Sequence, residues 1–493
     1  MAKPLEELRK IRLQKLEAIK KLGINPYPAR CQREQTVAQS LKMMSKKVAV
    51  AGRVMSVRGH GGIQFFDLQD ESAKIQLVFK SEKIKGKKAE LLSLLDIGDF
   101  IDVQGKVFKT DAGETSVAVE DFHLLTKSIR SLPSKWHGLK DVEERYRKRY
   151  LDLIMNPQVK KTFEMRAKIT TAVREFLDKE GFVEVETPTL QPIYGGATAR
   201  PFKTRHHTLD HDFYLKISDE LYLKRLIVSG FEKVYEIDKD FRNEGIDRIH
   251  NPEFTQMECY WAYADYHDIM KLTEELYAFV ARKVLGTTKV KFGENLIDFK
   301  TPWKRMTMKE GLKEYAKIDV DKLSDQEIKK LLEKHNLEVE EKPTLSGVAA
   351  GFNRGVAIAT LFELVEPYLI QPTFVYDFPR ETSALSKQKE DEPTIIERFE
   401  PYTAGFELGN AYSELNNPLI QKEFFEEQVK AAKSGDKEAH PMDQPYIEAM
   451  EYGMPPTGGL GLGIDRMVML MTNNQNIRDV ILFPTLRPER KKQ

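Results

Sequence analysis

Cysteine is scarce in this sequence, and long apolar runs are missing. Cys31 and Cys259 are the only two cysteines among 493 residues, which excludes a disulfide framework and a cysteine-ligated metal centre. So few thiols are typical of a protein from a reducing compartment. No apolar stretch could span a bilayer, and residues 1–24 lack the apolar centre that a secretory signal needs. We therefore expect a cytoplasmic protein without a membrane segment.

An excess of charge of one sign is also missing. Lysine and arginine number 77 and aspartate and glutamate 76, so the formal net charge is +1. Without a global positive field, any binding of nucleic acid must depend on local basic patches. The loops GxxxxGK[ST] and GxGxxG are absent too, which excludes a P-loop NTPase and argues against a dinucleotide-binding loop.

Length and pattern predict a multidomain chain. A sequence of 493 residues is too long for one compact core. An apolar stripe among basic residues predicts an amphipathic helix over residues 5–22, either solvated or in loose contact with an RNA backbone. The expected organisation is an N-terminal helical extension (1–47), an all-β barrel (48–130), a linker (131–157) and an α+β domain (158–493) with a charged helical insertion around 300–345, far from the chemistry.

Short strand candidates dominate the region from residue 48 to residue 128. Many strands in so few residues suit a small closed barrel such as the OB-fold, which commonly binds single-stranded nucleic acid. Arg58, Phe65 and Gln76 would then supply a cation, a stacking ring and a base-edge hydrogen bond. Other small barrels bind no nucleic acid, so this pattern alone leaves both readings open. The candidates cover residues 48–57, 62–70, 74–79, 100–108 and 115–125.

Beyond the linker, helix and strand patterns are mixed without regular βαβ alternation. A long helix is expected over about 159–180, ending at Gly181. The segment "FVEVETP" then alternates as a strand and stops at Pro188. This order predicts an α+β domain.

The segment "FRNEGIDRIHNPEFTQMECYWAYADY", residues 241–266, concentrates polar groups ahead of an alternating run. Side chains alternate across a strand, so Met257 and Cys259 are expected to face the core and Glu258 and Tyr260 a cavity. A surface hairpin with incidental salt bridges is the alternative, but the whole set favours a site. Two strands and a loop of about eight residues would hold this set around one space: Arg242, Glu244, His250, Asn251, Phe254, Glu258 and Tyr260.

A second constellation is "PPTGGLGLGIDRMVMLMTNN", residues 455–474. Its alternating glycines leave one strand face without side chains, which indicates close approach by a flat group or another backbone. Asp465 is expected to cap the helix that follows. A planar base between Phe254 and the Arg466 guanidinium would fit. A glycine-rich packing seam is an equally good interpretation of this segment alone.

A third constellation is "RFEPYTAGFELGNAYSELNNP", residues 398–418. Asn410, Tyr412 and Glu414 share one face of a strand. Glu400 and Glu407 add carboxylates, and clustered carboxylates near phosphate-binding arginines indicate Mg²⁺. Parity does not put Glu407 on the face of Glu414, so spacing alone cannot place Glu407 in the site.

These three constellations, in this order, resemble the three signature motifs of class II aminoacyl-tRNA synthetases. "GFVEVETP" is similar to motif 1, a dimer-interface element, "FRNEGIDRIHNPEF" to motif 2 and "GGLGLGIDR" to motif 3. "GGATARPF", "ELYLKRLIVSGFEKVYEI", "GNAYSELNNP" and "YGMPPTGGLGLGIDRMVML" resemble the lysine-specific members of subclass b. The resemblance covers nearly the whole chain and implies an OB-fold barrel followed by an antiparallel sheet flanked by helices.

The resemblance also implies a set of ligands and residue roles. The substrates would be ATP in a bent shape, L-lysine and tRNA(Lys), with Mg²⁺ as cofactor and a homodimer as the assembly. Catalytic charge stabilisation falls to Arg242 and Arg466. The implied ATP-binding residues are Arg242, Glu244, His250, Asn251, Phe254, Glu400 and Arg466; the metal ligands Glu400 and Glu407; the lysine-binding residues Gly196, Glu220, Arg242, Glu258, Tyr260, Asn410, Tyr412 and Glu414; and the anticodon-binding residues Arg58, Phe65, Gln76 and Glu114.

The pocket residues agree with lysine as the substrate. Lysine carries an ammonium on a four-carbon stem, so its pocket needs an acid at the far end and an aromatic wall. Glu414 and Tyr412 meet both needs. Two departures from the family pattern lie beside this pocket: Ala411-Tyr412 in place of the usual glycine-phenylalanine, and Ser218-Asp219 in place of the usual alanine-proline. Both leave the functional groups in place, so they bear on selectivity for the side chain.

Three alternatives remain at this point. One is an aspartate- or asparagine-specific synthetase of the same subclass, although its pocket would want a cation or amide donors where Glu414 stands. A second is a paralogue that transfers lysine to a protein, which would lack the barrel. A third is a non-catalytic RNA-binding module built on the same fold, against which the retained Arg242, Glu244 and Arg466 argue.

Overall fold

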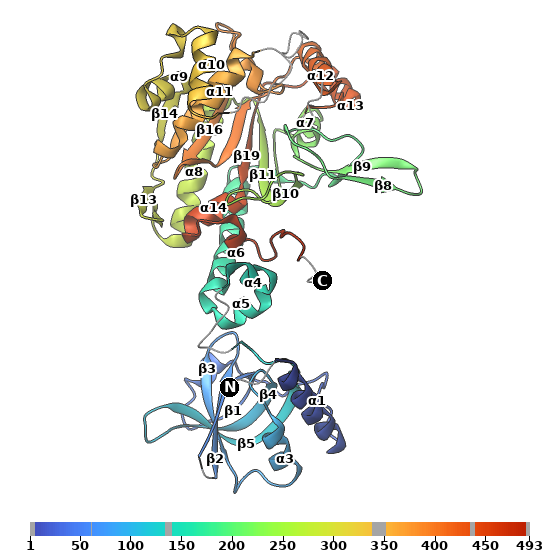
Figure 1. The fold of residues 1–493 in the computed structure, drawn as a ribbon, viewed down its shortest axis with the longest axis vertical. Helices are drawn as coiled ribbons and strands as arrows, with labels where there is room; N and C mark the ends of the chain where they lie inside the picture. Colours follow the sequence, from blue (N-terminus) through green and yellow to red (C-terminus); the bar gives the residue numbers. More distant parts are fainter. Residues whose placement is uncertain (1–4, 61, 134–140, 338–351, 434–438, 490–493) are drawn as a thin grey trace. The chain divides into compact units, whose positions relative to one another are not determined.

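The computed structural model describes residues 5–60, 62–133, 141–337, 352–433 and 439–489. The chain divides into two compact units, Met1–Lys140 and Asp141–Gln493, and each is described separately (Figure 1). Among the described residues, no helix has both the length and the apolar character needed to cross a membrane.

The smaller unit is a closed five-stranded barrel with the strand order β1-β2-β3-β5-β4, which confirms the predicted OB-like barrel. The pairs are antiparallel except for β3 with β5. Alternating apolar residues such as Val48, Val50 and Phe66 fill the interior, as the period of two requires. The strands are β1 (Lys47–His60), β2 (Ile63–Gln69), β3 (Lys74–Lys80), β4 (Phe100–Lys109) and β5 (Thr115–Thr126), with short helices α2 (Val37–Ser40) and α3 (Lys87–Leu94).

Helix α1 (Leu5–Lys21) confirms the helix predicted for residues 5–22, but its basic face is not entirely solvated. Leu16 and Ile19 are buried, and Arg12 is only 8% exposed. The Arg12 guanidinium donates to the carbonyl oxygen of Ile97 at 2.8 Å and to that of Ser128 at 3.1 Å. Its side chain therefore ties the helix to the barrel, because backbone carbonyls can satisfy a guanidinium that leaves water.

The larger unit is built on a nine-stranded sheet with the order β14-β15-β16-β18-β19-β11-β10-β6, and β17 pairs with β16. Its central pairs are antiparallel, as predicted, while the pairs at its two edges are parallel. The strands are β6 (Val183–Glu184), β10 (Lys233–Phe241), β11 (Glu253–Ala262), β14 (Lys304–Thr307), β15 (Thr373–Pro379), β16 (Ile395–Thr403), β17 (Phe406–Glu407), β18 (Gly409–Ser413) and β19 (Thr457–Gly463).

Helices cover the sheet, as predicted (Figure 1). Helices α6 (Pro157–Lys179), α8 (Tyr266–Leu285) and α14 (Ile464–Thr472) bury their apolar faces in one core with Met257 and Cys259 of β11. These two residues belong to the odd face of the alternation, so the predicted core face is confirmed. Helices α7 (Glu220–Val228), α12 (Pro418–Lys433) and α13 (Gln444–Glu451) contribute to a separate cluster that includes Tyr412.

Local sequence explains where α8 begins and ends. The Asp265 side chain accepts from the backbone N–H groups of His267 and Asp268. The Asp268 side chain in turn accepts from the Asp265 backbone N–H, which completes a capping box. Gly286 stops the helix in the left-handed region at φ 75°. This fixed helix supports the strands that carry the candidate site.

The region around 300–345 is not entirely helical, contrary to the prediction. Residues Lys304–Thr307 form β14, which adds a parallel edge strand beside β15, and Met306 enters a core with Phe362. This strand has only four residues and begins with a lysine and an arginine, so its alternation of buried and exposed positions is not visible in the sequence. Residues 338–345 of the predicted insertion lie outside the described residues.

The remaining elements frame these layers. They are α4 (Val142–Arg147), α5 (Arg149–Met155), α9 (Met308–Gly311), α10 (Asp325–Lys334), α11 (Arg354–Leu361) and α15 (Ile477–Val480), the strands β7 (Leu190–Gln191), β8 (Lys203–His206) and β9 (His211–Leu215) of a small sheet, the pair β12 (Lys289–Phe292) and β13 (Asn295–Asp298), a π-helical turn at Leu312–Ala316, and 3₁₀ turns at Val320–Lys322, Phe362–Leu364, Glu366–Tyr368 and Arg380–Thr382.

Candidate active site

A cavity of about 430 Å³ lies on the sheet face that carries the even-numbered residues of β11. All the predicted ATP, metal and lysine ligands line it except Glu414, which is buried just behind the lining. The lining members of that set are Gly196, Glu220, Arg242, Glu244, His250, Asn251, Phe254, Glu258, Tyr260, Glu400, Glu407, Asn410, Tyr412 and Arg466.

One end of the cavity is formed by the loop between β10 and β11. The loop covers residues 242–252, which is longer than the predicted length of about eight residues because β10 ends at Phe241. Arg242 Nε donates to the carbonyl oxygen of Ile217 at 3.3 Å, and its guanidinium carbon lies 5.1 Å from the centre of the Phe254 ring. Asn251 Nδ2 donates to the backbone oxygen of Glu253 at 2.6 Å. In this structure the guanidinium over the Phe254 ring is therefore that of Arg242, whereas the sequence pattern indicated Arg466 opposite this ring.

Arg466 reaches the same end of the cavity from helix α14. Its Nη1 donates to the carbonyl oxygen of Glu407 at 2.6 Å, and its Nη2 lies 3.1 Å from His250 Nε2. Because a guanidinium only donates, Nε2 must accept, which places the His250 proton on Nδ1, 2.7 Å from Asp247 Oδ2. The loop between β10 and β11 and helix α14 thus bring positively charged and hydrogen-bond-donating groups to the same end of the cavity.

The predicted helix cap at Asp465 is wrong. Helix α14 begins at Ile464 with Gly463 as its N-cap, and Asp465 lies in its first turn. The Asp465 carboxylate accepts from Arg166 Nη1 at 2.5 Å and from the Thr255 backbone N–H at 2.7 Å. Partners on α6 and β11 therefore take the oxygens that a cap would use.

The glycines of β19 do allow close approach, but side chains of this chain make that approach at Gly459. A Cβ at Gly459 would collide with Glu414 Oε1 and would lie 2.6 Å from Tyr260 Cε1. At Gly461 it would meet Gln256 Nε2 at 3.0 Å, and at Gly463 it would make only ordinary contacts. Residue 459 therefore has to be glycine for the acid and the ring to occupy their places.

Two carboxylates face the cavity between the loop and β18. Glu400 lies on β16, and its oxygens accept from Arg398 Nη2 at 2.5 Å and from the Tyr402 hydroxyl at 2.6 Å. Burial, opposed by Arg398 and aided by repulsion from Glu407, raises the pKa of Glu400 to about 6. Glu407 comes from the separate short strand β17, which explains why its spacing from Glu414 did not place it. Carboxylate oxygens are the ligands that a hard divalent cation prefers, and such a cation would relieve the repulsion between Glu400 and Glu407.

The opposite end of the cavity is rich in buried acids and phenol rings. Glu220, Glu258 and Glu414 are 3%, 2% and 1% exposed. The Tyr412 hydroxyl donates to Glu220 Oε2 at 2.5 Å, and the Tyr260 hydroxyl donates to Glu258 Oε2 at 3.0 Å. Burial raises the pKa of Glu414 and of Glu258 above the ordinary value, with repulsion between the acids adding to the shift.

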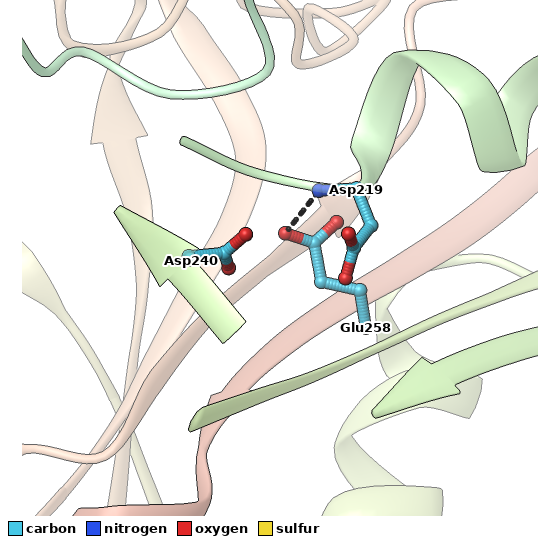
Figure 2. A group of neighbouring side chains, drawn as sticks. All are labelled: Asp219, Asp240 and Glu258. Carbon is cyan, nitrogen blue, oxygen red and sulfur yellow. Dashed lines mark hydrogen bonds between the residues drawn. The ribbon is translucent and has the colours of Figure 1, made fainter. Parts of the chain in front are cut away.

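The unusual pair Ser218-Asp219 adds contacts to these acids. The Ser218 hydroxyl donates to Glu258 Oε1 at 2.6 Å, and the Asp219 backbone N–H donates to the same oxygen at 3.2 Å. Figure 2 shows the Asp219 and Asp240 carboxyl groups converging on Glu258 from the start of α7 and the end of β10. Lys216 Nζ lies 2.6 Å from Asp219 Oδ1 and is the nearby counterion.

The pKa values of the Asp219 and Asp240 carboxyl groups are both raised. Burial is the main cause and raises the pKa of both well above the usual range; repulsion from Asp240 and Glu258 adds to the shift of Asp219, and repulsion from Glu258 adds to that of Asp240. Among the described residues, neither Asp240 oxygen has a hydrogen-bond partner. Three adjacent carboxyl groups in a buried site therefore hold protons more tightly than exposed ones would.

Sequence reasoning missed Lys224 and Arg398. Lys224 is fully buried and paired with Glu220, four residues earlier on α7, and with Glu414. The spacing of Glu220 and Lys224 on a helix was a readable signal for that pair. Arg398 Nε donates to Asn410 Oδ1 at 2.8 Å, a cross-strand contact that only the pairing of β16 with β18 reveals.

The barrel residues singled out from the sequence also lie together. Arg58 and Phe65 are opposed in the pairing of β1 with β2. Gln76 Nε2 donates to Glu114 Oε2 at 3.1 Å, and Gln76 is the cross-strand partner of Asp67. The four predicted residues thus occupy neighbouring positions on β1, β2 and β3 and at the residue just before β5.

Comparisons with known proteins agree with this architecture. Residues 141–487 match the model of the class II tRNA synthetases (D, K and N), and residues 48–125 match the OB-fold nucleic acid binding domain. A lysine–tRNA ligase of Thermoanaerobacter sp. (strain X514) is 51% identical over 492 residues, which cover 98% of this chain and 97% of that protein. Lysine–tRNA ligases of Pelotomaculum thermopropionicum and Carboxydothermus hydrogenoformans are 52% and 50% identical, over 98% of this chain and 96% and 99% of theirs.

Proposed function

Because the chain belongs to the lysine–tRNA ligases among the class II aminoacyl-tRNA synthetases, we propose that it activates L-lysine with ATP and attaches it to the 3′ end of tRNA(Lys). One observation carries this proposal. A single cavity joins guanidinium groups at one end to buried acids and phenol rings at the other. A triphosphate needs the first set, and the ammonium and stem of lysine need the second.

In the first reaction, the lysine carboxylate attacks the α-phosphorus of ATP, giving lysyl-adenylate and pyrophosphate. No side chain has to act as nucleophile, so the protein contributes orientation and charge stabilisation. Arg242 would hold the α-phosphate and the carboxylate, and Arg466 the γ-phosphate. Phe254 would stack on adenine, and Glu244 would contact its edge, while His250 and Asn251 serve the phosphates.

Magnesium would bind at Glu400 and Glu407 in this proposal. Its chemistry is to neutralise the triphosphate and hold its bent shape. Both carboxylates line the cavity, and Arg466 Nη1 lies 3.6 Å from Glu407 Oε2. The Arg398 and Tyr402 contacts of Glu400 fix its orientation.

In the second reaction, the terminal ribose hydroxyl of the tRNA attacks the carbonyl carbon of lysyl-adenylate and AMP leaves. The barrel would contribute recognition of the anticodon through Arg58, Phe65, Gln76 and Glu114. A uridine-rich single-stranded triplet suits stacking on a ring and hydrogen bonds to base edges. We also propose a homodimer, because the segment Gly181–Pro188 resembles a dimer-interface motif and Val183 is 47% exposed.

Amino-acid-dependent exchange of labelled pyrophosphate into ATP tests this proposal directly. The chain is incubated with Mg²⁺, ATP and lysine, aspartate or asparagine in turn. Lysine alone should support exchange, because a neutral or acidic side chain would bring no second cation to buried Glu414 beside Lys224. Exchange with aspartate or asparagine in place of lysine would show a different member of the subclass, and no exchange with any of them would show a non-catalytic protein.

A further inference from the structure

Lys224 is a buried cation at the amino-acid end of the cavity that the proposed reaction does not use. Its side chain is 0% exposed, and its Nζ forms ion pairs with Glu220 and with Glu414. The same Nζ lies 5.4 Å from the centre of the Tyr412 ring and 6.0 Å from that of Tyr260. The protein therefore holds an ammonium of its own against the acids and rings that would recognise the substrate.

The two acids keep this ammonium charged. Burial alone lowers the pKa of a lysine, but Glu220 and Glu414 outweigh burial and raise the pKa of Lys224 above its ordinary value. A buried charge is tolerated only when it is paired in this way. The ion pairs therefore lie just behind the residues that line this end of the cavity.

The two carboxylate oxygens of Glu414 differ in their contact with Lys224. Oε2 is the oxygen ion-paired with Lys224 Nζ, and neither oxygen has a hydrogen bond of normal geometry among the described residues. Oε1 lies against Gly459, where any side chain would collide with it, and Gly459 lines the cavity beside Tyr260. One oxygen is thus held from behind, and the other is left for a cation that enters the cavity.

The charges of the pocket match the charges of lysine. Glu220, Glu258 and Glu414 are buried acids, and Lys224 compensates one of them when all are ionised. Among these four side chains two negative charges then remain, and free lysine brings two ammonium groups, while its carboxylate would meet Arg242. Without Lys224, the same pocket would hold one negative charge more than the substrate can neutralise.

We propose that Lys224 is a positioning residue that fits the pocket to lysine by charge. It fixes Glu220 and Glu414 and leaves room for two ammonium groups, one of them on Glu414 Oε1. This inference rests on the proposed function and adds a selectivity-determining residue to it. The substrate ammonium joins Lys224 at Glu414 and does not displace it.

Lysine-dependent pyrophosphate exchange by Lys224→Met tests the inference, because methionine retains the length of the side chain and removes its charge. The KM for lysine should rise about tenfold or more, since one charged hydrogen-bonding partner is worth that factor. The KM for ATP should stay within about twofold. Lys224→Arg should restore part of the lost affinity, which a purely space-filling role would not produce.

Lys127→Met is the matched control. Lys127 is also 0% exposed and also bridges two carboxylates, those of Asp96 and Asp99, but it lies in the barrel unit. Its loss should leave the KM for lysine unchanged in the exchange reaction. A rise in that KM equal to the rise in Lys224→Met would mean that any lost buried lysine has this effect, and it would overturn the proposal.

An unchanged or lower KM for lysine in folded Lys224→Met would also overturn the inference without touching the proposed function. The proposed function fails instead if the unaltered chain shows no lysine-dependent exchange. Should Lys224→Met not fold, a crystal structure of the unaltered chain with lysine decides the matter. Lys224 Nζ should remain on Glu414 Oε2 with the substrate ammonium on Oε1, and an Nζ that has swung away refutes the proposal.

Discussion

The two ends of the cavity are organised in opposite ways. At the end with Arg242 and Arg466, the groups come from a loop and a helix start, and Glu244 and His250 are exposed to solvent. At the other end, Glu220 and Glu414 come from a helix and the end of a strand and are 3% and 1% exposed. One end is open and polar, and the other is desolvated before any ligand arrives.

The difference follows from what each end has to recognise. A triphosphate is large and strongly hydrated, so an open loop of donors can meet it without first burying unpaired charge. A single ammonium offers little area, so selection against neutral side chains requires an acid that has already lost its water. The cost of burying that acid is borne by the fold, partly through the ion pair with Lys224.

Arg242→Ala should have the largest effect, because it removes one of the two guanidinium groups at the open end of the cavity. Lysine-dependent pyrophosphate exchange should fall by about 10²-fold or more, since Arg242 would meet both the α-phosphate and the carboxylate. Arg205→Ala is the control, because Arg205 is an exposed arginine on β8 that does not line the cavity. Exchange near the level of the unaltered protein in Arg242→Ala would contradict the assigned role.

Glu414→Gln should affect only the desolvated end. The KM for lysine should rise by roughly 10- to 100-fold, because an amide replaces a carboxylate as the partner of an ammonium. The KM for ATP should change little, and steady-state exchange at varied concentrations of each substrate measures both values. Equal changes in the two KM values would erase the distinction between the ends of the cavity.

Phe65→Ala should have a smaller effect, and it should be visible only with tRNA. Stacking of a base on an aromatic ring is worth about 1–3 kcal/mol, so the KM for tRNA in aminoacylation should rise by roughly tenfold. Pyrophosphate exchange should not change, because both ends of the cavity lie in the other unit. Unaltered aminoacylation would assign the barrel another role, whereas a loss of exchange would show that the barrel supports the cavity.

Short-range pattern predicted much of this molecule. The five barrel strands and the two faces of β11 follow from a period of two, and that period is visible in the sequence without any tertiary information. The cavity residues could be predicted to lie together because they cluster in short stretches around residues 242 and 466 or belong to motifs that resemble those of the family. Their roles toward ligands remain predictions.

Contacts between distant segments could not be predicted in the same way. Glu407 enters the cavity because β17 folds back on β16, and no spacing from Glu414 records that turn. Asp465 resembles a helix cap, but the partners that take its oxygens lie on other elements, at Arg166 and Thr255. In each case, the tertiary partner overrides the local preference.

The smallest predicted effect concerns stability at the open end, where Glu366 lies beside Glu400. Burial, together with repulsion from Glu400 and Glu407, raises the pKa of Glu366 to about 7. The folded state therefore binds this proton more tightly than the unfolded state, so stability falls as pH rises from about 4.5 to about 7 and stays lower above that range. Glu366→Gln removes this loss, and its amide N–H can donate to the Tyr402 hydroxyl oxygen, which lies 3.3 Å from Glu366 Oε1 in the unaltered protein.

Thermal unfolding without Mg²⁺ measures the effect of Glu366→Gln. The Tm should match that of the unaltered protein near pH 4.5 and exceed it by roughly 2–4 °C at pH 8. Glu451→Gln, at an exposed position of α13 that is not among the charges acting on Glu366, is the control and should track the unaltered protein at both pH values. A Tm difference for Glu366→Gln that is the same at both pH values would mean that repacking, and not the proton, causes it; the carboxylates around Glu400 would then not repel one another strongly enough to attract a cation.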